Sequence, residues 1–353
     1  MVTVLPIQAS TRGPRPTRAR ARRAVLWSVA LFVLGDLGGS MLVDRMPGDL
    51  RFPEAGVFMS WAAAMPHGPD VLLLGSSRLL DVRPARIQAA AGEPSLAVLN
   101  ASAAAGDATT FDYLLARFIA AGRTPRLCIV ELNPEALARN NRMIGASLTR
   151  FFTWTDVARY GADLVRAGEL NAMIGARLAP FYRYRAALLE WMTRAVVGQR
   201  ARSAAPPPVA DEERAVRADP DAEPVQAWLD RVYASWMVDY EVGGASVDAL
   251  WALLDRARRN DVTVVLVGMP AATIHRRLQT PAVERRFQAH VAAIAKAYDT
   301  TFIDFRDRLD DGLFRDRYHF TPAGARAFGE ILGREVVAPR LQRAGGPESW
   351  RSY

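Results

Sequence analysis

Short runs of consecutive apolar residues recur along the chain, and turn-forming residues bound each run. Such runs are typical of strands that are buried on both faces of a sheet. They predict five strands, at Val71–Leu74, Leu96–Leu99, Leu127–Leu132, Val262–Val267 and Thr301–Phe305. Between them the apolar positions take helical spacing, as in Thr110–Ala121 and Val247–Arg258. This alternation predicts an α/β fold with a doubly wound, mostly parallel five-stranded sheet, in which sites form beyond the carboxyl ends of the strands.

A longer apolar stretch lies near the N-terminus, at residues 24–43, and follows a basic leader at residues 1–23. The leader holds six arginines and no acidic residue, so removing it lowers the formal net charge from +8 to +2. The basicity therefore belongs to the leader, and the rest of the chain carries no electrostatic signature of nucleic-acid binding.

Arginines before an apolar stretch predict that the N-terminus stays in the cytoplasm while the rest is exported. About 20 residues are needed to span a bilayer, and residues 24–43 reach that length if Asp36 is tolerated near the far interface. We therefore expect a single-pass transmembrane signal-anchor in the inner membrane, with the remaining chain on the periplasmic side. A cleaved signal peptide is the alternative, since Gly38, Gly39 and Ser40 are small.

A long insertion, residues 137–245, separates the third and fourth predicted strands. It divides the sheet domain into two parts, residues 65–136 and 246–342. The insertion is rich in helical pattern and aromatic residues, and its segment 203–225 has the Pro, Ala and acidic composition of a flexible linker. Two interpretations of the aromatic residues stay open: a helical cap that packs on the sheet domain, or a lid or substrate groove.

Metal and disulfide chemistry are not indicated by the sequence. Cys128 is the single cysteine and lies within an apolar run, as a small core residue would. The four histidines are scattered, so no metal site and no cofactor are expected.

Two segments far apart in the sequence carry the strongest candidate chemistry. Asp316 and His319 form a D-x-x-H stretch just before a predicted helix that begins at Pro322, with Thr321 as its N-cap. A histidine oriented by a carboxylate is the base half of a nucleophilic hydrolase site. Ser77 follows the first predicted strand in Gly75-Ser76-Ser77-Arg78, where a strand-to-helix turn can expose a hydroxyl.

Two further strand ends offer candidate donors to an oxyanion. Gly106 lies in a small-residue turn after the second strand, where a backbone N–H can approach a ligand. Asn133 comes just after the third strand, and its side-chain amide could complete an oxyanion hole together with the N–H of Ser77.

The ordered set of motifs resembles the SGNH hydrolase superfamily, also called GDSL-like esterases. Ser77 matches the family's nucleophile, Gly106 its second-block glycine, Asn133 its third-block asparagine, and Asp316 with His319 its Asp-x-x-His. Two blocks depart from the pattern: Ser76 replaces the aspartate of the GDSL branch, and the third block reads Glu-Leu-Asn-Pro rather than G-x-N-D.

The resemblance implies an acyl-serine mechanism, with Ser77 as nucleophile, His319 as base, Asp316 as its partner, and Ser77, Gly106 and Asn133 around the oxyanion. Gly-Ser-Ser-Arg, the N-terminal anchor and Val267-Gly268-Met269-Pro270 are similar to a branch of membrane-anchored envelope proteins, which includes D-alanyl-transfer and alginate O-acetylation proteins. It implies an esterase or acyltransferase acting on acyl esters of an envelope glycan, with a membrane acyltransferase as a possible partner. A non-catalytic envelope binding protein, or an assembly protein that docks through its insertion, remains the alternative.

Overall fold

Five parallel strands form one sheet in the computed structural model, in the order β2-β1-β3-β4-β5. They are β1 (Val71–Leu74), β2 (Val98–Asn100), β3 (Leu127–Glu131), β4 (Thr263–Gly268) and β5 (Thr301–Asp304). Each lies within one or two residues of a predicted run, so the predicted doubly wound α/β class is confirmed. The structure describes residues 18–46, 52–141 and 231–343, with part of the segment 154–193. Residues 1–17 of the leader and the predicted linker 203–225 lie outside the described residues.

The strand order fixes where a site can form. From β1 the chain crosses to the edge strand β2, and it then returns to β3 on the other side of β1. Connections that leave two neighbouring parallel strands in opposite directions open a crevice at their carboxyl ends. The loops after β1 and β3 therefore meet at this switch point.

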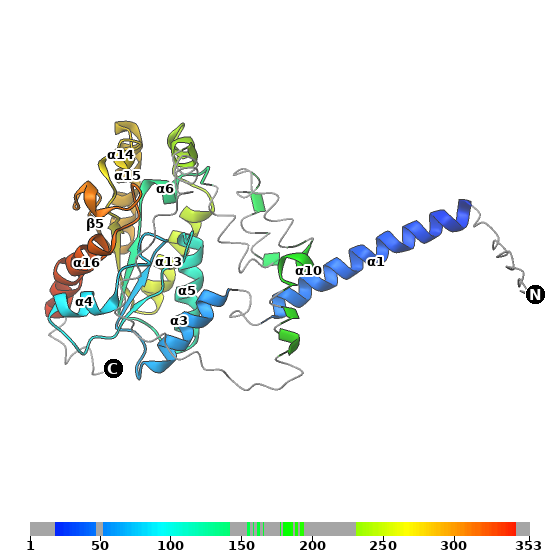
Figure 1. Ribbon diagram of the computed structural model, residues 1–353, viewed down its shortest axis with the longest axis horizontal. Helices are drawn as coiled ribbons and strands as arrows, with labels where there is room; N and C mark the ends of the chain where they lie inside the picture. Colours follow the sequence, from blue (N-terminus) through cyan, green and yellow to red (C-terminus); the bar gives the residue numbers. More distant parts are fainter. Residues whose placement is uncertain are drawn as a thin grey trace, which may run out of the picture.

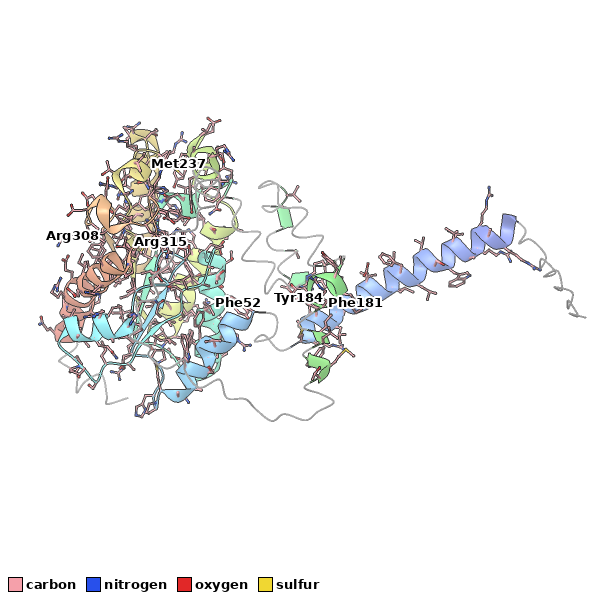
Figure 2. All side chains as sticks on the ribbon, in the orientation of Figure 1. Phe52, Phe181, Tyr184, Met237, Arg308 and Arg315 are labelled. Atoms are coloured by element: carbon pink, nitrogen blue, oxygen red, sulfur yellow. The ribbon has the colours of Figure 1, made fainter. Side chains whose placement is uncertain are left out.

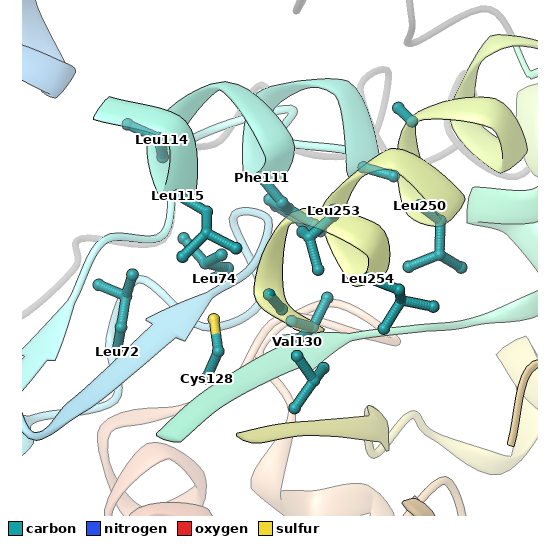
Figure 3. Packing of buried hydrophobic residues seen from close by; sticks show 14 of the residues in the cluster. Leu72, Leu74, Phe111, Leu114, Leu115, Cys128, Val130, Leu250, Leu253 and Leu254 are labelled. Atoms are coloured by element: carbon teal, nitrogen blue, oxygen red, sulfur yellow. The ribbon is translucent and has the colours of Figure 1, made fainter. Parts of the chain in front are cut away.

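Alternate residues of the strands enter two separate cores, because successive side chains point to opposite faces of the sheet. Leu72 and Leu74 pack into one core, which Figure 3 shows in part, while Val71 and Leu73 pack into the other. On the first face lie α3 (Pro53–Ala64), α5 (Ala108–Ala120), α13 (Ala245–Arg259) and α15 (Pro281–Tyr298). On the second lie α4 (Pro84–Ala91), α16 (Pro322–Ile331), the π-helical turn η2 (Leu332–Val337) and α17 (Ala338–Arg343). Helices thus cover both faces of the sheet (Figure 1).

The two helices expected from spacing are present, as α5 and α13, and each extends slightly beyond its predicted start. Short helical turns occur in the connections: α6 (Pro134–Leu137), α10 (Pro180–Arg183), α14 (Thr273–Arg276) and the 3-10 turn η1 (Asp311–Leu313). Cys128 is fully buried in the first core, as predicted, and burial raises the pKa of its thiol (Figure 3).

One helix, α1 (Arg18–Arg45), is long and apolar enough to cross a membrane, judged by length and composition. It projects away from the sheet, and most of its apolar side chains are exposed (Figure 1). Only its C-terminal end has neighbours within the described chain, where α10 packs against it (Figure 2, with Phe181 and Tyr184 labelled).

Candidate active site

The turn after β1 is unusually crowded, and the crowding explains its glycine. A Cβ atom on Gly75 would lie 2.4 Å from the Leu79 side chain and 3.0 Å from Oε2 of Glu131. Only glycine allows the chain to turn here without moving those groups. The turn brings Ser76 and Ser77 to the switch point between β1 and β3.

Ser77, His319 and Asp316 form a hydrogen-bonded series across this switch point. Oγ of Ser77 lies 2.9 Å from Nε2 of His319, and Nδ1 of His319 lies 2.6 Å from Oδ2 of Asp316. The backbone N–H of His319 also donates to Oδ1 of Asp316, at 2.8 Å. The structure therefore brings together three residues that are separated by up to 242 positions in the chain.

The carboxylate is ionised and faces the imidazole. Burial alone would raise the pKa of Asp316, but the bonds from the ring and backbone of His319 outweigh it, so the pKa lies below its ordinary value. A charged carboxylate at Nδ1 keeps the proton on that nitrogen and leaves Nε2 free to accept one from Ser77. The side chain of His319 is 15% exposed, which leaves the site open to a ligand.

Two local features hold the loop that carries Asp316 and His319. An antiparallel bridge joins Phe314 to Phe320, and Arg317 between them adopts a positive φ of 53°. Thr321 is the N-cap of α16, as predicted: its side chain accepts from the N–H of Gly324 and donates to the carbonyl of Leu313. The position of His319 is thus fixed from both sides.

Gly106 lies against the nucleophile turn, but its N–H is already used. A Cβ atom on Gly106 would lie 2.8 Å from the carbonyl oxygen of Gly75, so the two backbones are in contact. The N–H of Gly106 donates to the carbonyl of Ala103 at 2.9 Å. To donate to an oxyanion, this N–H has to share its hydrogen between two acceptors or break its bond to Ala103. The role of Gly106 therefore stays a prediction.

Asn133 is buried, and its side chain links β3, β4 and the nucleophile turn. Its Oδ1 accepts the N–H of Met269 at 3.0 Å, and its Nδ2 donates to Oε1 of Glu131 at 3.1 Å. Nδ2 carries two hydrogens, and this bond uses one of them. Asn133 therefore keeps a second side-chain N–H that this bond does not use.

Sequence reasoning did not assign a role to Glu131, which anchors the nucleophile turn. Its Oε2 accepts the N–H of Ser76 at 2.7 Å, and its Oε1 accepts the hydroxyl of Ser76 at 3.0 Å. Burial raises the pKa of Glu131, and the nearby Arg78 and the Ser76 donors offset only part of that rise. The sequence signal that could have indicated this role is an acidic residue at the end of an otherwise apolar strand.

Arg78, next to the nucleophile, was also missed as part of the site. Its guanidinium is buried and donates to the carbonyls of Met269 and Pro270, at 3.1 and 2.8 Å. The same group lies 5.4 Å from the centre of the Tyr318 ring. Arg78 thereby ties the loop after β4 and the loop of His319 to the turn of Ser77.

A second imidazole and carboxylate pair is buried behind the site. Nε2 of His275 lies 2.5 Å from Oε1 of Glu135, and the His275 ring is stacked on Tyr318 at 5.3 Å. Burial alone would raise the pKa of Glu135, but the hydrogen bond and charge of His275 lower it to about 2. This pair is 2–8% exposed at its side chains, so it supports the Tyr318 loop from within.

The described end of the insertion reaches this same region. Residues 231–237 are helical, and the Tyr233 hydroxyl donates to the hydroxyl of Tyr318 at 2.8 Å. Trp236 beside it is 2% exposed, as in a helix that packs on the sheet domain. Tyr318 is adjacent to His319, so the insertion contacts the loop that carries the imidazole. Among the described residues, no group of three or more His, Cys, Asp or Glu side chains could hold a metal ion.

Known proteins resemble this chain in structure at low similarity only. No family model and no curated protein matches the sequence. Among solved structures, a GDSL-like lipase from Bacteroides thetaiotaomicron is 10% identical with a TM-score of 0.39, covering 82% of this chain and 99% of the lipase. A putative platelet activating factor from Streptococcus pneumonia is 11% identical with a TM-score of 0.37, covering 88% and 97%. Both TM-scores are below 0.5, and the candidate site is defined by the contacts among Ser77, His319 and Asp316.

Proposed function

We propose that this chain is a membrane-anchored, extracytoplasmic serine esterase or O-acyltransferase of the SGNH type. The hydrogen-bonded series of Ser77, His319 and Asp316 is the observation that supports it most directly. A serine at a strand-to-helix turn, a histidine within hydrogen-bond distance and an ionised carboxylate behind it form the arrangement that acyl transfer needs.

The proposed first step acylates the serine. Oγ of Ser77 attacks the ester carbonyl while Nε2 of His319 takes its proton, and Asp316 stabilises the resulting imidazolium. The oxyanion is stabilised by the N–H of Ser77 and the free donor of Asn133, with Gly106 as a third donor if its bond to Ala103 is shared. Collapse of the intermediate breaks the ester bond, and the departing alkoxide takes the proton from His319.

The second step decides between hydrolysis and transfer. His319 removes a proton from an incoming hydroxyl, which attacks the acyl group on Ser77, and the serine oxygen leaves with that proton. Water as the incoming group gives an esterase, and a sugar hydroxyl gives an O-acyltransferase. The acceptor we propose is an envelope glycan or a related polyol, with a membrane acyltransferase as a candidate donor of the acyl group.

The Ser77→Ala variant tests the proposal, with hydrolysis of a small activated ester as the assay. We expect kcat/KM to fall by about 10³-fold or more, because removal of a nucleophile leaves only binding and oxyanion stabilisation. Ser60→Ala is the matched control, since Ser60 is exposed on α3 and bonds only locally to Val57. Equal activity of wild type and Ser77→Ala would refute the mechanism.

A fluorophosphonate probe separates an enzyme from a binding protein of the same fold. The probe should label Ser77 in the folded wild type, with the adduct located by mass spectrometry of the peptide. Absence of labelling in protein with a normal unfolding transition would favour a non-catalytic envelope binding protein. Incubation with candidate acyl donors, followed by the same mass analysis, would identify the acyl group that Ser77 accepts.

A further inference from the structure

The segment around α10 belongs to the insertion, yet it packs on the end of α1 rather than on the sheet domain. The α10 segment is defined here by its described residues: Arg177, Ala179–Arg185, Leu188, Leu189 and Trp191–Thr193. Within it, Tyr184 and Leu188 form a buried apolar cluster with Val43 and Met46 of α1, and Trp191 packs against that cluster. Figure 1 shows α10 beside the end of α1 that faces the sheet domain.

A buried ion pair fixes this contact. Nη1 of Arg177 donates to Oδ1 of Asp44 at 2.7 Å and to Oγ of Ser40 at 3.2 Å, and Arg177 is 1% exposed. A charged side chain is buried only where a partner compensates the lost hydration. The α10 segment and the C-terminal end of α1 therefore form one packed unit.

The contact lies near the C-terminal end of the apolar stretch of α1, where a spanning helix would leave the hydrocarbon core. A Cβ atom on Gly39 would lie 2.4 Å from the ring of Phe181, so Phe181 packs directly on that glycine. Gly39 precedes Val43, the end of the apolar stretch, by four residues, which is about 6 Å along a helix axis. If residues 24–43 span the hydrocarbon core, Phe181 lies within about one helical turn of its edge.

The exposed side chains of the segment suit that environment. Tyr182 is 74% exposed and Leu189 is 65% exposed, and Phe181 and Met192 are also at least half exposed. Arg185 stacks on Tyr182 with its guanidinium 4.8 Å from the ring centre. Aromatic rings and arginines with apolar stems are enriched where hydrocarbon meets headgroups, because one end of each is apolar and the other polar.

We infer that the α10 segment is a membrane-interface element that inserts the side chains of Phe181, Tyr182, Leu189 and Met192 among the lipids beside α1. The inference rests on the proposed anchoring by α1, and it adds a second lipid contact supplied by the insertion. The anchor alone would contact lipid through one helix, whereas the α10 segment adds a second lipid contact that is packed on that helix. This part of the insertion then lies at the outer surface of the bilayer, where a membrane-associated acyl donor would be met.

Spin-label accessibility in the full chain reconstituted into lipid nanodiscs tests this directly. Nitroxide labels are attached to Tyr182→Cys and Leu189→Cys, and their collision rates with oxygen and with a water-soluble nickel chelate are compared. Oxygen concentrates in lipid and the chelate in water, so both labels should favour oxygen. Val238→Cys is the matched aqueous control, since Val238 is 64% exposed and lies in the turn directly after the helix at residues 231–237. Native Cys128 is fully buried and should not react with the label.

A label at Phe32→Cys, in the middle of α1, distinguishes a failure of the interface contact from a failure of the anchor. Lipid exposure at Phe32 with chelate exposure at 182 and 189 like that at 238 would overturn this inference and leave the anchor intact. Protection of 182 and 189 from both reagents would also overturn it, because another protein surface would then cover them. Chelate exposure at Phe32 would contradict the anchor itself. None of these outcomes bears on labelling of Ser77 by the fluorophosphonate, which tests the chemistry separately.

Discussion

At the scale of single residues, the site depends on two imidazole and carboxylate pairs with different surroundings. His319 and Asp316 are partly exposed and meet Ser77, whereas His275 and Glu135 are buried and meet Tyr318. The exposed pair can exchange protons with a substrate. The buried pair has no such access, and its contribution is to support the loop that presents His319.

Asp316→Asn should retain the fold and lose most of the activity. An amide at this position can donate to Nδ1 of His319, which moves the ring proton to Nε2 and leaves no base for Ser77. In a serine protease the equivalent change lowers kcat by about 10⁴-fold, and we expect a loss of about 10³-fold or more here. Steady-state hydrolysis of a small ester measures it, with circular dichroism to verify the fold. A variant with near wild-type kcat would remove Asp316 from the mechanism.

The buried pair predicts an opposite pH dependence of stability in wild type and in His275→Ala. In wild type the pKa of Glu135 is lowered from 4.5 to about 2, so its contribution is present above about pH 4.5 and is lost as the pH falls toward 2. Without His275 the buried carboxylate loses its main partner and keeps only the long bond from the amide of Gln279, which costs up to about 3–5 kcal/mol at neutral pH. Protonation relieves that cost, so the difference between the two proteins should shrink as the pH falls.

Urea unfolding at several pH values measures this difference. His67→Ala is the control, because His67 is exposed and its curve should parallel that of wild type. A difference between His275→Ala and wild type that stays constant from pH 7 to pH 3 would show that the lost packing on Tyr318, rather than the charge of Glu135, accounts for the effect.

At the scale of elements, the strands were predictable and the support of the site was not. The central strands β1, β3 and β4 are runs of mostly buried apolar residues, so Val71–Leu74 and the other two could be predicted from a short stretch of sequence. The edge strand β5 is only partly buried. Ser77 could be predicted because it follows a strand, and the Asp316 loop because it precedes a capped helix. Glu131, Arg78 and the pair of Glu135 with His275 act through hydrogen bonds spanning 55 to 192 positions, which no local pattern encodes.

Two threonine caps allow a matched test of how one helix end serves the site. Thr321 caps α16 two residues after His319, and Thr280 caps α15 by the same kind of bond, to the N–H of Val283. Replacement of either by alanine should lower the free energy of unfolding by about 1 kcal/mol. Only Thr321→Ala should also lower kcat, because it removes the side-chain bond to Leu313 and leaves the backbone N–H of residue 321 as the one remaining bond between them. A wild-type kcat in both variants would mean that the backbone bond from residue 321 to Leu313 and the bridge of Phe314 and Phe320 are sufficient to hold the loop.

At the scale of the whole molecule, charge and apolar surface are separated along the chain. The leader carries six of the eight units of the net positive charge, and α1 carries about half of the large exposed apolar side chains found among the described residues. The sheet domain buries its apolar residues on both faces. Such a distribution suits a folded domain tethered to a bilayer, with the tether's charge on one side and the domain on the other.

Single cysteines in intact cells test this arrangement across the membrane. Because arginines before a spanning helix stay on the cytoplasmic side, a cysteine replacing Gln8 should react with a membrane-impermeant maleimide only after the cells are permeabilised. A cysteine replacing Val238, which is exposed in the turn after the helix at residues 231–237, should react without permeabilisation of the inner membrane. Labelling of both without permeabilisation, in protein found free of the membrane, would indicate a cleaved or absent anchor. The reverse pattern, with Gln8→Cys accessible and Val238→Cys protected, would place Ser77 in the cytoplasm and remove envelope glycans as acceptors.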